Sequence, residues 1–237
     1  MCGLNKDQRI AALSYAFSNG NGNIDTTIGK YPWTVAILYV KGRAQKLHCG
    51  GSLISTKHIL TASHCFTGKT KEDLTVIVGS EDSFSFDITK QGQEFKIKDF
   101  VRHPNYTQSK VYFDVAIIEM DKPVTFSFTI HPICLPKVPN TDMDSIKNIP
   151  ATLSGYGSKS GETSTVIHYS PLTIMEQKEC EVRHFVDLKT SNSEFGQALW
   201  RQVQLILDSE RKISNELLCT KAPIEELGTC PGGCKID

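Results

Sequence analysis

The stretch CGGSLISTKHILTASHCF (residues 49–66) decides the fold prediction, because it joins two cysteines, two short β-rich runs and a histidine. Turn residues separate the two runs, a pattern that is typical of a β-hairpin. A disulfide between Cys49 and Cys65 would close a loop of about 15 residues and contribute roughly 3 kcal/mol in the chain-entropy model. It would also hold the backbone of His64 in place.

His64 has two interpretations at this point. An immobile imidazole at the start of a turn suits a general base, because a base must meet its proton donor at hydrogen-bond distance. The ordinary alternative is a surface or packing histidine, since the chain has seven histidines. The stretch by itself leaves both open.

Short β-rich runs continue on both sides of this stretch. They are WTVAILYV (33–40), LTVIVGS (74–80), FKIKDFV (95–101) and DVAIIEM (114–120). Their spacing predicts an all-β fold, as in an antiparallel barrel or sandwich. A proline-rich stretch, HPICLPKVPNTD (131–142), predicts a linker, and β-rich runs resume at Ala151.

One segment departs from the β pattern. Apolar side chains recur at helical spacing in residues 191–212, where Ser193 is a candidate N-cap. The apolar positions are Phe195, Leu199, Val203, Ile206 and Leu207. The pattern predicts an inserted amphipathic helix near residues 194–211.

Composition excludes several classes of partner. The 237 residues contain 26 Lys plus Arg and 26 Asp plus Glu, so no net charge attracts nucleic acid or an anionic membrane. The longest apolar run, residues 33–40, is too short to span a bilayer. We therefore expect neither a nucleic-acid partner nor a membrane partner.

The eight cysteines favour disulfides over a metal site, because they form no paired C-x-x-C motifs and have no histidines at zinc-finger spacing. We expect no metal and no other cofactor. Oxidised cysteines predict an extracellular, secreted protein whose natural start lies upstream, since the first ten residues lack the apolar stretch of a signal peptide. Asn105-Tyr106-Thr107 is a glycosylation sequon that suits this compartment.

The residues 49–66 resemble the signature around the catalytic histidine of the trypsin/chymotrypsin family of serine endopeptidases, C-G-G-[ST]-L-I followed by T-A-[AS]-H-C. Four further motifs stand in the order of the family, one before this stretch and three after it. They are GKYPWTVAI (29–37), DVAIIEM (114–120), HPICLP (131–136) and SGYG (154–157). Five ordered matches over more than a hundred residues leave little room for chance.

The resemblance implies two antiparallel β-barrels of the chymotrypsin type, the second one incomplete. The expected divisions are an N-terminal propeptide-like segment (1–27), a first barrel (28–135), a linker (136–150) and a second barrel (151–237). It also implies that His64 is the general base and that Asp114 is the buried carboxylate that accepts the imidazole N–H. The implied disulfides are Cys49–Cys65, Cys180–Cys219 and Cys2–Cys134.

The chain departs from the family where the nucleophile belongs. The family block C-x-G-D-S-G-G-P falls on Cys230-Pro231-Gly232-Gly233-Cys234-Lys235, which places Gly232 in the oxyanion hole and Cys234 in the place of the serine. Three explanations compete: an interrupted sequence, a catalytically dead homologue that acts by binding, and a cysteine nucleophile at Cys234. We expect the first, because a chain that ends at Asp237 lacks the strands that close the second barrel.

The resemblance therefore implies a serine-type endopeptidase that cleaves proteins or peptides through an acyl-enzyme, with the 237-residue form inactive. The alternative is a binding or regulatory homologue. Expected partners are protein substrates and the proteases or inhibitors of a cascade.

Overall fold

The structure is a computed structural model, and it describes residues 2–3, 30–42, 44–80, 92–108, 113–136, 146–159, 162–176 and 220–221. The chain divides into two compact units. One consists of Met1–Leu135, Ser154–Tyr169 and Thr229–Asp237, and the other of Pro136–Leu153 and Ser170–Gly228. The candidate site lies in the first of these units.

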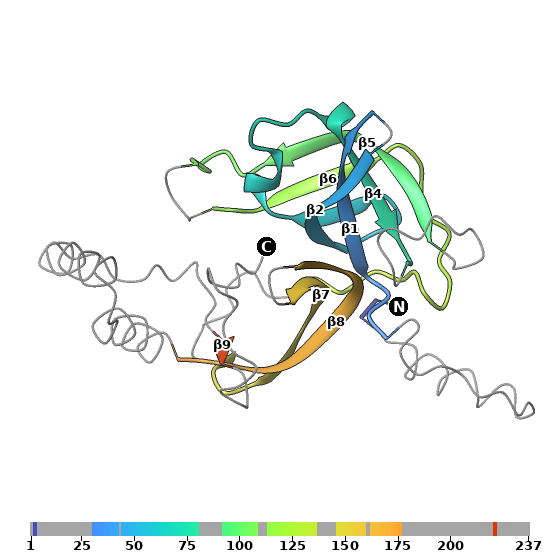
Figure 1. The fold of residues 1–237 in the computed structure, drawn as a ribbon. Coiled ribbons are helices and arrows are strands. Elements are labelled where there is room, and N and C mark those ends of the chain that lie inside the picture. Colours follow the sequence, from blue (N-terminus) through green and yellow to red (C-terminus); the bar gives the residue numbers. More distant parts are fainter. Residues whose placement is uncertain are drawn as a thin grey trace, which may run out of the picture. The chain divides into compact units, whose positions relative to one another are not determined.

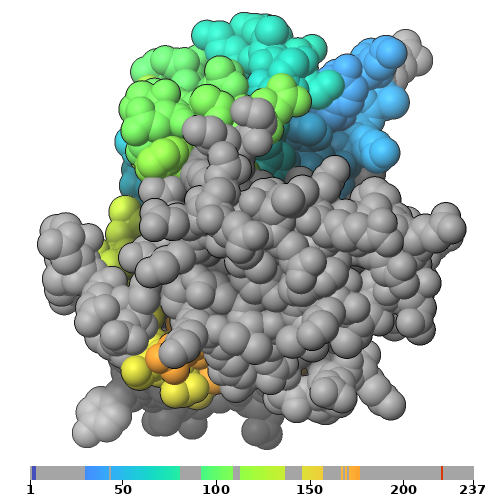
Figure 2. Space-filling view, turned by 90° about the vertical axis from the view of Figure 1, so that its left-hand side faces the viewer, coloured from blue at the N-terminus to red at the C-terminus, as the bar shows by residue number. Residues whose placement is uncertain are grey.

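Six antiparallel strands close into a barrel in the order β1-β2-β3-β6-β5-β4 (Figure 1). The strands are β1 (Thr34–Lys41), β2 (Ala44–Leu53), β3 (His58–Thr61), β4 (Leu74–Val78), β5 (Gln93–Arg102) and β6 (Ala116–Met120). In the space-filling view, barrel residues coloured blue to green gather in one part of the surface (Figure 2). The all-β prediction is confirmed at this level.

Alternation along β6 contributes side chains to the barrel interior, whereas Thr34–Leu38 of β1 and all of β4 are buried throughout. In β6, Ala116, Ile118 and Met120 are buried, whereas Ile117 is exposed, as the period of two along a strand requires. The largest fully buried core side chains come from several strands and from the segment that follows β6. They include Val35, Ile37, Leu53, Ile59, Val76, Val78, Ile118, Met120 and Ile130. This closed core is the rigid scaffold for the site.

Gly51 allows β2 and β3 to approach closely. A Cβ atom at Gly51 would lie 2.8 Å from Ile59 Cγ2 and 3.2 Å from the Leu60 carbonyl oxygen. Both distances are shorter than ordinary van der Waals contact. The strand pair that precedes His64 therefore requires glycine at this position.

A second sheet has three strands in the order β7-β8-β9. These are β7 (Pro150–Lys159), β8 (Glu162–Ile174) and β9 (Thr220–Lys221), and Thr173 of β8 pairs with Lys221. The complete second barrel stays a prediction. The expected helix near 194–211 lies outside the described residues, as does most of the expected linker and of the N-terminal segment.

Within the described part of the chain, no helix has both the length and the apolar character that a membrane span needs.

Candidate active site

The site forms where strands β3 and β6 run side by side. Their antiparallel register pairs Thr61, the last residue of β3, with Ala116, the first residue of β6. The residues that follow Thr61 therefore lie opposite the residues that precede Ala116. This register brings together two segments that lie 50 residues apart in the sequence.

His64 lies in a short 3-10 helix, η1 (Ser63–Phe66), directly after β3. Its ring Nδ1 is 2.7 Å from Asp114 Oδ2, and its backbone N–H donates to Asp114 Oδ1 at 2.8 Å. Both oxygens of one carboxylate thus contact the same residue, and both side chains are about 30% exposed (30% for His64 and 28% for Asp114). The imidazole ring has little freedom to rotate, because the Asp114 carboxylate contacts both the ring and the backbone N–H of His64.

This geometry determines the chemistry that the imidazole can perform. An ionised carboxylate only accepts hydrogen bonds, so Nδ1 carries the proton in the pair and the basic lone pair belongs to Nε2. The carboxylate then stabilises the positive charge that forms when Nε2 takes up a proton. The pair can act as a general base for a nucleophile placed at Nε2.

Asp114 lies in the centre of a three-residue turn. The Val115 N–H donates to the Phe113 carbonyl oxygen at 2.8 Å, an i to i+2 bond typical of a γ-turn. Phe113 has a φ of 58°, which is unusual for a bulky residue. Its ring stacks on His103 with centroids 4.7 Å apart, and the His103 N–H donates to the Val115 carbonyl oxygen at 2.9 Å. The turn that presents the carboxylate is therefore fixed on both sides.

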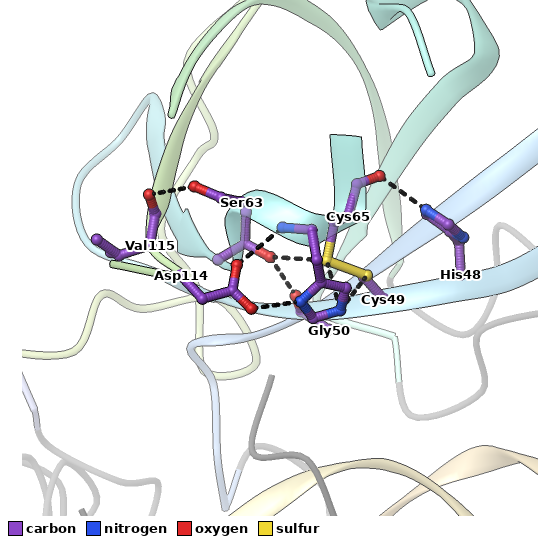
Figure 3. Close-up of polar contacts among 9 residues, drawn as sticks. His48, Cys49, Gly50, Ser63, Cys65, Asp114 and Val115 are labelled. Carbon is purple, nitrogen blue, oxygen red and sulfur yellow. Dashed lines mark hydrogen bonds and ion pairs between the residues drawn. A yellow bond between two sulfur atoms is a disulfide. The ribbon is translucent and has the colours of Figure 1, made fainter. Parts of the chain in front are cut away.

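A disulfide between Cys49 and Cys65 supports the histidine segment (Figure 3). Cys65 is fully buried and Cys49 is 6% exposed. His64 Nε2 is 4.0 Å from Cys49 Sγ and 3.8 Å from Cys65 Sγ. These three atoms cluster as metal ligands do, but the two sulfurs are bonded to each other and offer a metal no thiolate.

Ser63 also contributes to the site, although the sequence did not single it out. Its side chain is fully buried, and its hydroxyl donates to the Val115 carbonyl oxygen at 2.7 Å (Figure 3). The signal in the sequence was a serine directly beside His64 at a family position that accepts Ala or Ser. Without the register of β3 and β6, nothing indicated that this hydroxyl points toward the Asp114 segment.

The other predicted site residues have different outcomes. Cys2 and Cys134 form a disulfide, and the Gly3 N–H donates to the Pro132 carbonyl oxygen at 2.8 Å. Asn105 is exposed in a turn that the Tyr106 N–H closes on the His103 carbonyl oxygen. The Cys180–Cys219 pair, Gly232 and Cys234 lie outside the described residues.

A sequence profile of the family described as Trypsin matches residues 21–233, which is most of the chain. The chain belongs to the trypsin family. Its closed six-stranded barrel is consistent with the all-β fold of this family, and the roles of His64 and Asp114 stay predictions. The prediction of a trypsin-like serine protease family member is thus confirmed.

Two curated trypsin-family relatives show how far this similarity extends. The chain is 31% identical over 167 residues to chymotrypsin-2 of Vespa crabro, which covers 69% of each protein. It is 28% identical over 181 residues to proclotting enzyme of Tachypleus tridentatus, which covers 72% of this chain. The matched segment spans 48% of proclotting enzyme, about half of that relative's length.

Proposed function

We propose that the protein is a serine-type endopeptidase that cleaves proteins through an acyl-enzyme. The observation that carries this proposal is the double contact between His64 and a single carboxylate, at 2.7 Å from the ring and 2.8 Å from the backbone. In this mechanism Nε2 of His64 takes the proton of the nucleophile and then gives it to the leaving amine. Asp114 orients the ring and stabilises its charged form throughout.

The nucleophile in this proposal is a serine that the block from Cys230 to Lys235 does not contain. We propose that the form with this block is inactive and that the active form carries a Gly-Asp-Ser-Gly-Gly sequence in its place. In that form the glycine at the position of Gly232 would donate its backbone N–H to the oxyanion hole. The alternative is a catalytically dead homologue that binds its partners, and the absence of the serine from this block favours it.

A direct test begins with the transcript beyond the codon for Thr229. A downstream Gly-Asp-Ser-Gly-Gly block would support the endopeptidase, and the corresponding protein should hydrolyse peptide substrates and react with a fluorophosphonate probe. His64→Ala should abolish the labelling, because the serine is a weak nucleophile without its base. A transcript that ends as this chain does, together with unlabelled protein, would support the binding homologue instead.

The same probe also tests the form that ends in the Cys230 to Lys235 block. We expect no fluorophosphonate labelling of this 237-residue form. A thiol-directed peptidyl probe that labels Cys234 only when His64 is present would show a cysteine nucleophile and contradict the proposal.

We propose an extracellular location, because the described cysteines are paired in disulfides and such bonds persist in oxidising compartments. The proposed partners are protein substrates and the proteases or inhibitors of a cascade. The name of the relative in Tachypleus tridentatus, proclotting enzyme, fits such a setting. Secretion of tagged protein from a eukaryotic cell with its natural leader, followed by separation with and without reductant, tests the location.

A further inference from the structure

The Ser63 hydroxyl has no part in the mechanism above, yet it lies beside both residues of the pair. The side chain is fully buried, and its Oγ donates to the Val115 carbonyl oxygen at 2.7 Å (Figure 3). It does not cap its own helix, because the N-cap of η1 is Ala62, which makes no side-chain capping bond. The hydroxyl instead crosses to the neighbouring segment. A buried hydroxyl that donates to a backbone carbonyl is also a poor nucleophile.

The Val115 carbonyl connects three segments. It accepts hydrogen bonds from the Ser63 hydroxyl and from the His103 backbone N–H, at 2.7 Å and 2.9 Å. The N–H of Val115 closes the turn around Asp114. Val115 is thus fixed through both of its peptide groups, and the residue before it carries the carboxylate.

Two consecutive residues of η1 therefore hold two consecutive residues before β6. Ser63 holds the Val115 backbone, and His64 contacts both oxygens of Asp114. The first contact joins the two backbones, and the second places the ring against the carboxylate. Because only one peptide unit separates them, we expect a change in the first contact to shift the second.

We propose that Ser63 is a positioning residue, whose bond to the Val115 carbonyl keeps the Asp114 carboxylate within hydrogen-bond distance of the His64 ring. This inference rests on the proposed general-base role of the pair. The family signature accepts Ala or Ser at this position, so the hydroxyl is not common to all sequences that match the signature. Water does not substitute easily for it, because the position is fully buried.

The test uses the proton that His64 Nδ1 shares with Asp114, which resonates far downfield in proton NMR. In the unmutated protein we expect this resonance and slow exchange with solvent. In Ser63→Ala the proton should exchange about fivefold faster or broaden beyond detection, as the loss of one neutral hydrogen bond implies. A resonance with unchanged position and lifetime in Ser63→Ala would overturn the proposal.

Thr75→Val is the matched control. Thr75 is a buried residue of β4, and its hydroxyl lies 2.9 Å from the Phe95 carbonyl oxygen and 3.1 Å from Glu94 Oε1, so it can donate to either acceptor, away from the pair. The control loses a comparable bond but should keep the downfield proton. Equal losses of the signal in both variants would indicate general destabilisation and would also overturn the proposal.

A measurement on the unmutated protein covers the case in which Ser63→Ala does not fold. The Ser63 hydroxyl proton should exchange slowly and show a nuclear Overhauser effect to the Val115 segment. A hydroxyl proton in fast exchange with water would overturn the positioning role. Absence of the downfield His64 proton from the unmutated protein would contradict the proposed function as well. A form that carries the Gly-Asp-Ser-Gly-Gly block, shows all these signals and is still inactive would contradict the proposed function alone.

Discussion

His64 meets one carboxylate in two ways: its ring Nδ1 lies 2.7 Å from Asp114 Oδ2, and its backbone N–H donates to Asp114 Oδ1 at 2.8 Å. The two contacts fix both the position and the rotation of the imidazole. Since the backbone contact does not depend on ring protonation, it keeps the segments together while the ring exchanges protons. The backbone contact therefore supports the fold, and the ring contact serves the proton transfer.

Replacement of Asp114 by asparagine should preserve the fold and remove the activity. The amide oxygen can still accept the His64 backbone N–H, but the amide NH2 makes Nδ1 an acceptor and moves the ring proton to Nε2. A protonated Nε2 is no base, so kcat of the active form should fall about 10⁴-fold, the loss given by this change in the well-studied serine-protease triad. Imidazole nitrogen shifts in NMR should report the exchanged tautomer directly.

The control for this prediction is Asp121→Asn. Asp121 Oδ1 also accepts a backbone N–H, from Lys96 at 3.2 Å, but the residue lies at the exposed end of β6. Asp121→Asn should leave both the tautomer of His64 and the activity unchanged. An active Asp114→Asn variant would contradict the role assigned to the carboxylate.

Gly51→Ala should destabilise the barrel. The added Cβ would lie 2.8 Å from Ile59 Cγ2 and 3.2 Å from the Leu60 carbonyl oxygen, so β2 and β3 must separate. Overpacking of this kind costs about 1–3 kcal/mol. Urea denaturation should show a lower midpoint for this variant.

Gly50→Ala is the matched control for Gly51→Ala. A Cβ at Gly50 meets nothing closer than the Val35 carbonyl oxygen at 4.0 Å, which is ordinary contact. Its unfolding free energy should stay within about 1 kcal/mol of the unmutated protein, or rise, because alanine restricts the unfolded chain. If both variants unfold at the same urea concentration, the close approach at Gly51 has no energetic effect.

The pair of Lys98 and Glu119 should make stability depend on pH. Their side chains meet across β5 and β6 at 2.7 Å, and the hydrogen bond from Lys98 lowers the pKa of Glu119. A group whose pKa falls on folding stabilises the folded state above its ordinary pKa, and that contribution is lost as pH falls through the lowered value. Glu119→Gln should therefore lose less stability on acidification below about pH 4.5 than the unmutated protein does.

Thermal unfolding at a series of pH values measures this difference. The difference in stability between Glu119→Gln and the unmutated protein should shrink at about 1 M salt, where the Debye length is about 3 Å. Salt can screen this ion pair because both side chains are partly exposed to solvent. The same bond raises the pKa of Lys98, so its contribution is present at neutral pH and, on the alkaline side, is lost as strong alkali deprotonates the amine. A salt-independent difference between the two proteins would argue against this ion pair as the cause.

Asn105 should carry an N-linked glycan when the protein passes through a secretory pathway. Asn105 and Thr107 are both exposed in the turn after β5, so the acceptor amide is accessible. Digestion with an amide-cleaving glycosidase should increase gel mobility in the unmutated protein. Asn105→Gln should migrate at the digested position before digestion, and Thr107→Ser should still be modified. A glycan that persists in Asn105→Gln would refute the assignment.

Much of the first barrel could be predicted from the sequence. The runs in residues 33–40, 74–80 and 95–101 became β1, β4 and β5 with small changes at their ends, because short runs rich in β-branched and aromatic residues between turn residues favour strands. The strand predicted for residues 114–120 starts two residues before the observed strand. The strand begins at Ala116, because Asp114 and Val115 form the tight turn that presents the carboxylate.

The sequence by itself predicted which residues carry the chemistry: a histidine before a cysteine and an aspartate before a strand, in motifs that resemble those of the trypsin family. Local pattern suffices there, since motif, strand period and disulfide spacing are properties of short stretches. The family resemblance implied that Asp114 accepts the imidazole N–H of His64, but only the tertiary structure showed the second contact, from the His64 backbone N–H, and the bond from Ser63 to the Val115 carbonyl oxygen. The physical reason is the antiparallel register of β3 and β6, which pairs Thr61 with Ala116 across a separation that no local pattern encodes.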